Sequence, residues 1–237
     1  MQCDGNRRLD STGRERKNHQ VSEAAEFIDF TLQREATEER ALAEKDSGDG
    51  LRYYGASVGA VRGTVRDAGR KFRPLSHDQV TALSSELWTH PVFELRLAAV
   101  VLLQSNQRLL RNSDLTRIEG FLRDARTAAL VDPLAVDVVG PLIDGLTDQS
   151  RVRAESILDR WAREPDPWLR RAAILAPLRT VRAAGVEAER AVRRTRAAAA
   201  SDDSDLVQQA VAMLCAEWAK QNPARVPARW PLHSVGH

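Results

Sequence analysis

The sequence is poor in the residues that build sheets, disulfides and metal sites. Only two cysteines occur, Cys3 in a polar segment and Cys215 in an apolar helical pattern, and this separated pair predicts neither a disulfide nor a metal site. Tyrosine and phenylalanine are scarce, and β-branched residues form no alternating runs, which argues against a sheet protein. The histidines also lack the spacing of metal ligands: His19, His77, His90, His233 and His237.

Long apolar runs are missing as well. No stretch approaches the roughly 20 apolar residues of a transmembrane helix, so we expect no membrane partner. Residues 1–5 are not followed by an apolar stretch, so we expect no signal peptide. Together with the unpaired cysteines, these features predict a cytoplasmic protein.

What the sequence does contain favours helices. Hydrophobic residues make up 43% and charged residues 29% of the chain, which is typical of a globular protein. Alanine, leucine, arginine and glutamate are abundant, and all four are good helix formers. The net charge is only +2, but acidic residues concentrate in residues 23–49 and basic residues in 62–73 and 179–196. We therefore expect an all-α protein with two basic segments.

The helix signals divide the chain into one domain and two tails. Residues 1–20 are polar and aperiodic, which predicts a disordered tail. Residues 21–225 are predicted to form a single helical-repeat domain that opens with an amphipathic helix over 21–45, and residues 226–237 a C-terminal tail. Ser57 and Ser76 are candidate helix N-caps, the second with Gln79 as a capping box. Asp132-Pro133 and Asp166-Pro167 both match the start of a helix, with the aspartate as N-cap.

Short helices joined by brief capped turns imply antiparallel neighbours. About ten such helices in succession fit an α-solenoid of HEAT-like or ARM-type repeats, a curved right-handed array of antiparallel helix pairs, better than a four-helix bundle. No sharp internal repeat accompanies the pattern.

Four segments, in order, resemble the AlkD-like DNA alkylation repair family. They are YYGAS at 53–57 with Val61-Arg62, ELW at 86–88 with ELR at 94–96, Trp161 with DPWLRRAAIL at 166–175, and VQQAV at 207–211 with Glu217, Lys220 and Pro223. The similarity covers about residues 50–225. It implies HEAT-like repeats with a concave, positively charged face that binds double-stranded DNA. It also implies hydrolysis of the N-glycosidic bond of alkylated purines.

The chemistry that the resemblance implies needs no metal and no cofactor. A purine alkylated at N3 or N7 is cationic, and its loss passes through an oxocarbenium-like transition state. One carboxylate near the sugar offsets the developing positive charge, and aromatic faces add cation–π contacts. The family's catalytic aspartate matches Asp132. Its two cage tryptophans fall at Ala128 and Met213, so both aromatic positions are replaced.

Each candidate residue also has a structural interpretation. Asp132 can be a helix N-cap, and Arg171 can be a phosphate contact by the resemblance or else a solvated or core-capping arginine. Met213 and Cys215 can be packing residues. The spacing of three tryptophans matches apolar helix faces, which favours core positions for Trp161, Trp168 and Trp218.

Basic stripes are the remaining candidates for DNA contact. Three- or four-residue spacing places Arg62, Arg66, Arg70 and Arg73 on one helix face, and Asp67 is the only acid among them. Arg190, Arg193 and Arg194 cluster similarly, and Arg170 and Arg171 lie in the third segment of the resemblance. Such stripes are often only solvated faces, but unpaired arginines suit phosphate oxygens and give sequence-independent, salt-sensitive binding.

Two functions therefore follow from the sequence. The first is a monomeric DNA glycosylase for cationic alkylated purines, with Asp132 as electrostatic stabiliser and the arginines on the DNA backbone. The alternative is a catalytically silent helical-repeat module that binds DNA or a protein partner.

Overall fold

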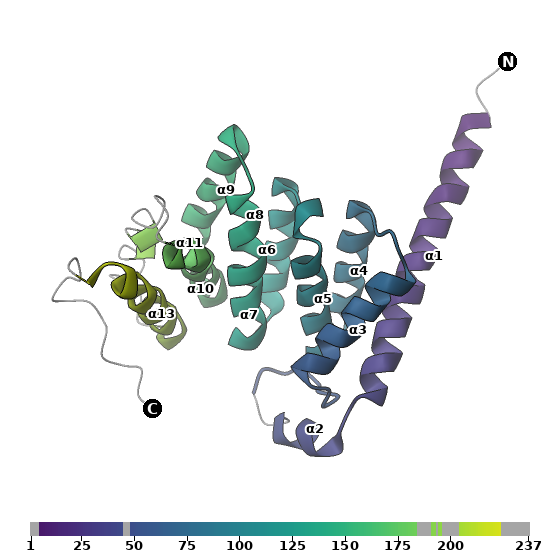
Figure 1. Ribbon diagram of the computed structural model, residues 1–237, viewed down its shortest axis with the longest axis horizontal. Helices are drawn as coiled ribbons and strands as arrows, with labels where there is room; N and C mark the ends of the chain where they lie inside the picture. The colour runs from purple at the N-terminus through teal and green to yellow at the C-terminus, as the bar shows by residue number, and fades with distance from the viewer. Residues whose placement is uncertain (1–4, 45–47, 184–190, 193, 196–203, 224–237) are drawn as a thin grey trace. The chain divides into compact units, whose positions relative to one another are not determined.

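The computed structural model describes residues 5–44, 48–183, 191–192, 194–195 and 204–223, with side chains from residue 19 onward except that of Glu44. The chain divides into two compact units, Met1–Leu109 and Leu110–His237, which are described separately (Figure 1). Every regular element in the described ranges is helical, apart from an isolated bridge between Arg52 and Val92. The prediction of an all-α protein is confirmed.

The N-terminal unit consists of five α-helices and one short 3₁₀ turn in its described part. They are α1 (Gly5–Arg34), α2 (Glu38–Glu44), α3 (Val58–Lys71), α4 (His77–Thr89), α5 (Phe93–Ser105) and η1 (Gln107–Leu109). Ser57 caps α3 by accepting from Ala60 N, and Ser76 with Gln79 forms a capping box on α4. Both caps were predicted from the sequence.

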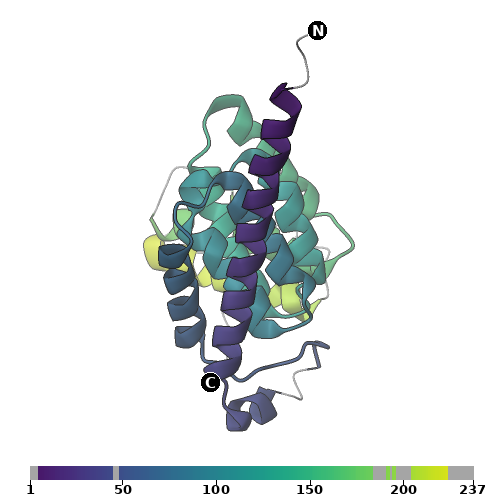
Figure 2. The ribbon, with the colours of Figure 1, turned by 90° about the vertical axis from the view of Figure 1, so that its right-hand side faces the viewer.

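Helix α5 forms the centre of this unit. Every side chain from Glu94 to Leu103 is buried, because α3 and α4 both pack against it. Helix α1 lies along α3 and α4 (Figure 2) and contributes the fully buried Ile28 and Leu32. The close packing of α4 and α5, which are joined by residues 90–92, is the helix-pair arrangement that the short turns predict.

Glu94 joins two of the segments that carry the family resemblance. Its buried carboxylate accepts hydrogen bonds from the backbone N–H groups of Tyr54 at 3.0 Å, Gly55 at 2.7 Å and Ala56 at 3.1 Å. Gly55 has a φ of +89°, and a Cβ there would lie 2.2 Å from the Thr37 carbonyl oxygen. The connection between α2 and α3 therefore requires both a carboxylate and a glycine.

The predicted disordered tail is wrong for residues 5–20, which belong to α1. No proline interrupts them, and extending a helix that is already anchored costs little. The anchor is visible at Gln20, which donates to the Phe72 carbonyl at 3.0 Å and accepts from Gln79 Nε2 at 2.6 Å. The predicted helix over 21–45 is interrupted at residues 35–37, because Thr37 N bonds to the Gly55 carbonyl instead of continuing the helix.

The described part of the C-terminal unit is also helical. Its elements are η2 (Asn112–Asp114), α6 (Leu115–Asp124), α7 (Ala128–Leu134), the π-helical η3 (Ala135–Val139), α8 (Gly140–Asp144), α9 (Asp148–Trp161), α10 (Pro167–Leu175), α11 (Leu178–Arg182) and α13 (Asp205–Gln221). Helix α10 is central and packs against α6, α7, α9 and α13. Gly140 permits a close approach nearby, since a Cβ there would lie 2.2 Å from the Ala176 carbonyl oxygen.

The two Asp-Pro pairs behave differently. Asp166 caps α10, with its side chain accepting from Trp168 N at 2.8 Å and Leu169 N at 3.4 Å, as predicted. Asp132 is not an N-cap, so that interpretation is wrong: α7 starts four residues earlier at Ala128, capped by Thr127, and Pro133 lies inside the helix. Proline has no N–H to donate to the preceding turn, and the π-helical η3 follows immediately.

The helix pairs of both units are compatible with an α-solenoid fold, whereas the right-handed curvature and the single domain over 21–225 stay predictions. Trp161 and Trp218 are core residues as expected, and Trp168 is half-buried. None of the described helices combines the length and apolar character needed to cross a membrane.

Candidate functional site: a carboxylate held by a buried arginine

Asp132 lies on α7 and forms a bidentate ion pair with Arg171 of α10. Arg171 Nε donates to Asp132 Oδ1 at 2.6 Å, and Nη2 donates to Oδ2 at 2.8 Å. The Asp132 side chain is 26% exposed, and that of Arg171 only 3%. The arginine is therefore buried behind the carboxylate, while the carboxylate reaches the surface.

The remaining contacts of Arg171 connect this pair to α13. Nη1 donates to the Leu206 carbonyl at 2.6 Å, and Nη2 lies 3.9 Å from the sulfur of Met213. All three nitrogens of the guanidinium thus have protein partners, and the side chain has almost no exposed surface. These contacts favour the structural alternative, a core-capping arginine, whereas a phosphate contact by Arg171 stays a prediction.

The structure brings together the positions that the resemblance singled out. Ala128 lies four residues before Asp132, so the two share one face of α7, and Met213 lies against the arginine that holds Asp132. Met213 is 37% exposed and Ala128 is half-buried. A ligand reaching Asp132 would therefore meet a thioether and a methyl group where the family pattern has two indole rings.

The pair fixes both the orientation and the charge of the carboxylate. Two parallel N–H···O bonds hold Asp132 in one rotamer, yet an ionised carboxylate has about four acceptor positions, so lone pairs remain for a ligand or a water. The adjacent guanidinium also offsets the negative charge and weakens the field that a cationic ligand would feel. The site can thus orient a polar group well but attract a cation only moderately.

Arg170 points to the other side of α10. Its Nη1 donates to the carbonyl oxygens of Glu164 and Pro165, both at 2.7 Å, so it holds the turn between α9 and α10. A phosphate contact by this residue stays a prediction.

The stripe of Arg62, Arg66, Arg70 and Arg73 belongs to the N-terminal unit and is exposed. Arg62, Arg66 and Arg70 lie on α3, whereas Arg73 follows the end of that helix, so the prediction that all four share one helix face is wrong for Arg73. Asp67 lies 3.7 Å from Arg66 Nε and 3.4 Å from Arg70 Nη1, in pairs whose side chains are mostly exposed. Exposed pairs of this kind contribute little. A polyanion could therefore replace Asp67 as the partner of Arg66 and Arg70.

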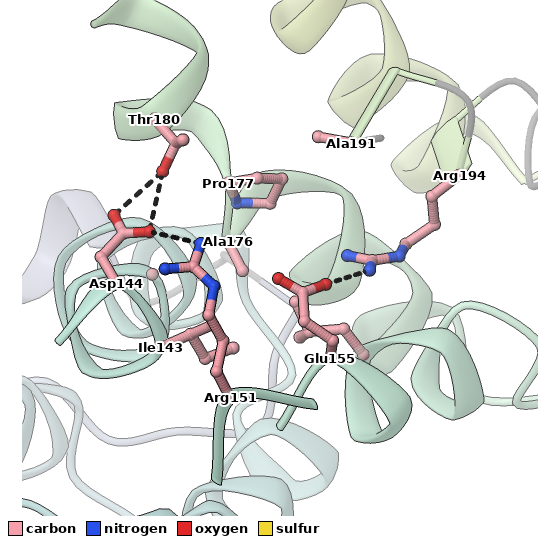
Figure 3. Close-up of a pocket in the computed structure, with 11 residues that line it drawn as sticks. Ile143, Asp144, Arg151, Glu155, Ala176, Pro177, Thr180, Ala191 and Arg194 are labelled. Carbon is pink, nitrogen blue, oxygen red and sulfur yellow. Dashed lines mark hydrogen bonds and ion pairs between the residues drawn. The ribbon is translucent and has the colours of Figure 1, made fainter. Parts of the chain in front are cut away.

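The described part of the second basic cluster is Arg194, whose guanidinium is already paired with acids. Arg194 is paired with Asp159 at 2.6 Å and with Glu155, and only 8% of its side chain is exposed. Figure 3 shows the Glu155–Arg194 pair beside a small pocket of about 20 Å³, where Asp144 also accepts from Thr180. Because Arg194 already pairs with two acids, its described contacts do not favour DNA binding, and DNA contact by this residue stays a prediction. Arg190 and Arg193 lie outside the described residues.

A second carboxylate, Glu119 on α6, was missed by the sequence analysis. It accepts from Arg160, from Trp161 Nε1 at 2.9 Å and from Arg123 at 3.0 Å. Hydrogen bonding from Arg160, then from Trp161 and Arg123, outweighs the opposing effect of burial and lowers the pKa of Glu119 from 4.5 to about 2. The i,i+4 spacings of Glu119 with Arg123 and of Arg160 with Glu164 were the local signals for this network. It fixes Trp161, one of the resemblance residues.

The described residues include no group of three or more histidine, cysteine or acidic side chains placed to hold a metal ion. The geometry instead defines a class: helical proteins in which packed helix pairs present one carboxylate, held from behind by a buried arginine.

The sequence assigns the family within that class. Residues 28–228 match the family described as DNA alkylation repair enzyme, and the chain belongs to this family. A search of curated proteins gives no significant match. The family assignment makes DNA repair the general role and DNA the corresponding partner.

Proposed function

We propose that the protein excises cationic alkylated purines from double-stranded DNA by hydrolysing the N-glycosidic bond, with Asp132 as the electrostatic stabiliser. The observation that supports this most directly is the ion pair of Asp132 and Arg171. A buried arginine holds the carboxylate in one orientation at the surface, at the position where the family resemblance implies the catalytic aspartate.

Loss of a cationic purine needs little catalytic assistance from the protein. A purine alkylated at N7 or N3 carries positive charge and leaves as a neutral base, so no acid is needed to protonate it. The sugar gains positive charge as the bond breaks, and a fixed carboxylate lowers the free energy of that transition state. A lone pair of Asp132 not used by Arg171 is available to orient the attacking water.

A specific observation also favours the silent binding module. Arg171 offsets the charge of Asp132, and neither Ala128 nor Met213 supplies an aromatic face. An aromatic face is worth about 0.5–2 kcal/mol in cation–π contact. The absence of aromatic rings at positions 128 and 213 therefore predicts slow base excision. If excision is no faster than spontaneous base loss, the protein is a DNA-binding module and not an enzyme.

The decisive measurement is release of N7-methylguanine from methylated duplex DNA. We expect the wild-type protein to release it faster than free DNA does, and Asp132→Asn to reduce the rate to that of free DNA. Asp137→Asn is a matched control, since Asp137 lies five residues further along and pairs with Arg179 instead. Equal rates for wild type, Asp132→Asn and free DNA would support the silent module.

Folding must be separated from chemistry in this experiment. Asp132→Asn leaves the buried Arg171 without its counter-charge, which costs about 3–5 kcal/mol for a fully buried pair and less for this partly exposed one. The double variant Asp132→Asn with Arg171→Met removes both charges. It should recover thermal stability yet stay as inactive as the single variant, because neither contains the carboxylate.

A further inference from the structure

An open hollow of about 470 Å³ lies in the N-terminal unit, where the C-terminal half of α3 faces the end of α5. Its floor includes Val65 and Leu102, which are almost fully buried. Small-molecule sites typically measure roughly 300–1,000 Å³. The hollow is therefore large enough for a ligand of nucleotide size.

Two arginines of the exposed stripe line the hollow, whereas the other two do not. Arg66 and Arg73 are lining residues; Arg62 and Arg70 are not. Arg73 Nε donates to the Gly69 carbonyl at 3.1 Å, which holds the side chain against the end of α3 and leaves its terminal nitrogens to face a ligand. Paired guanidinium groups suit the oxygens of a phosphate.

The opposite wall offers acceptors. The Ser105 hydroxyl donates to the Val101 carbonyl at 2.8 Å, and Asn106 Nδ2 donates to the Leu102 carbonyl at 2.8 Å. The Ser105 hydroxyl hydrogen is thereby used, whereas Asn106 Nδ2 keeps one free hydrogen, and both Ser105 Oγ and Asn106 Oδ1 retain acceptor capacity. The arginine donors on one wall match a phosphate, and the acceptors on the opposite wall match the amino-bearing edge of a base. The apolar floor between them matches the flat face of that base.

We propose that this hollow binds a single unpaired nucleotide of DNA, with its phosphate on Arg66 and Arg73 and its base over Val65 and Leu102. The inference rests on the proposed function to the extent that the ligand is DNA. It adds that the N-terminal unit distinguishes duplexes with an unpaired nucleotide from perfect ones.

The test compares the affinity of the full-length protein for a perfect duplex and for the same duplex with one bulged adenosine, by fluorescence anisotropy. We expect about tenfold tighter binding to the bulged duplex, the value of one charge-assisted hydrogen bond. Arg73→Gln and Arg66→Gln should each remove most of this preference. Arg62→Gln, a matched change on the same helix, should weaken binding to both duplexes alike and preserve the ratio.

A second pair of variants tests the hollow itself. Ser105→Trp fills the hollow and should abolish the preference, while Ser105→Ala keeps the space, removes one acceptor and should lower the preference only in part. Equal binding of both duplexes by the wild type overturns the inference but leaves duplex binding intact; binding to neither overturns the proposed function as well. Deoxyadenosine monophosphate is the probe for a free nucleotide, and its binding without any bulge preference would overturn the assignment to DNA.

Discussion

Met213 lies beside Arg171 at a position where the family resemblance implies a tryptophan. Its exposed side chain leaves room for a larger one. We expect Met213→Trp to raise the rate of N7-methylguanine release about 2- to 30-fold, because a cation–π contact of about 0.5–2 kcal/mol would form with the cationic purine. Single-turnover kinetics on methylated duplex DNA would measure the change.

Met213→Leu is the control for the Met213→Trp prediction, since it conserves size without adding a π face. If both variants release the base at the wild-type rate, position 213 does not contact the lesion.

The sequence located Asp132 but gave it the wrong structural role. Asp132-Pro133 and Asp166-Pro167 share the same local signal, and only the second is a helix start. What distinguishes them is a contact with Arg171, 39 residues away in the chain. A local pattern contains no information about such a partner, whereas the family resemblance pointed to both residues without relating them.

At the scale of the helices, Glu119 on α6 bonds to Arg160 and Trp161 at the end of α9. The stability of the folded protein at low pH therefore depends on the ionisation of this carboxyl group. Its pKa is about 2 in the folded protein against an ordinary 4.5, so its contribution to stability is fully present above about pH 5 and is lost as the pH falls toward 2. The difference between these two pKa values corresponds to roughly 3 kcal/mol. We expect Glu119→Gln to destabilise the protein by about that amount at pH 7 and progressively less at lower pH.

Urea unfolding of wild type and Glu119→Gln at pH 7, 5, 4 and 3 would measure this. Glu39→Gln, at an exposed position on α2, is the comparison variant. A difference between wild type and Glu119→Gln that stays constant from pH 7 to 3 would show that the carboxyl is not held ionised by Arg160, Trp161 and Arg123.

Helix positions followed from the sequence wherever a cap and an apolar period agreed. Ser57, Ser76 and Asp166 start helices as predicted. The errors fall where a contact distant in sequence decides: Thr37 bonds to Gly55 and ends a predicted helix, and Asp132 pairs with Arg171 instead of capping a helix. Anchoring through Gln20 likewise extends α1 into a segment whose composition alone favours disorder.

For the whole molecule, the main electrostatic question is whether the stripe on α3 binds the DNA backbone. We expect the double variant Arg62→Gln/Arg70→Gln to weaken binding to all duplex sequences alike. It should also reduce the slope of log affinity against log salt by about 1.8, or about 0.9 for each phosphate that the protein no longer neutralises. Titrations between about 50 and 300 mM salt would measure the slope.

Asp67→Asn provides a control of opposite sign. It removes the only acid of the stripe, the one that lies near Arg66 and Arg70, and should strengthen binding while leaving the stripe's arginines in place. An unchanged salt slope in the double variant would show that the stripe is an ordinary solvated face.

The pairing of Asp132 with Arg171 also changes what the aspartate signifies when related chains are judged from sequence. An inactive descendant could not easily discard it, because the buried guanidinium would be left without its counter-ion and the domain would lose stability. The carboxylate would then persist for folding long after catalysis had ceased. The residues at positions 128 and 213 are not the counter-ions of a buried charge. They are therefore better markers than Asp132 for distinguishing active enzymes from silent relatives.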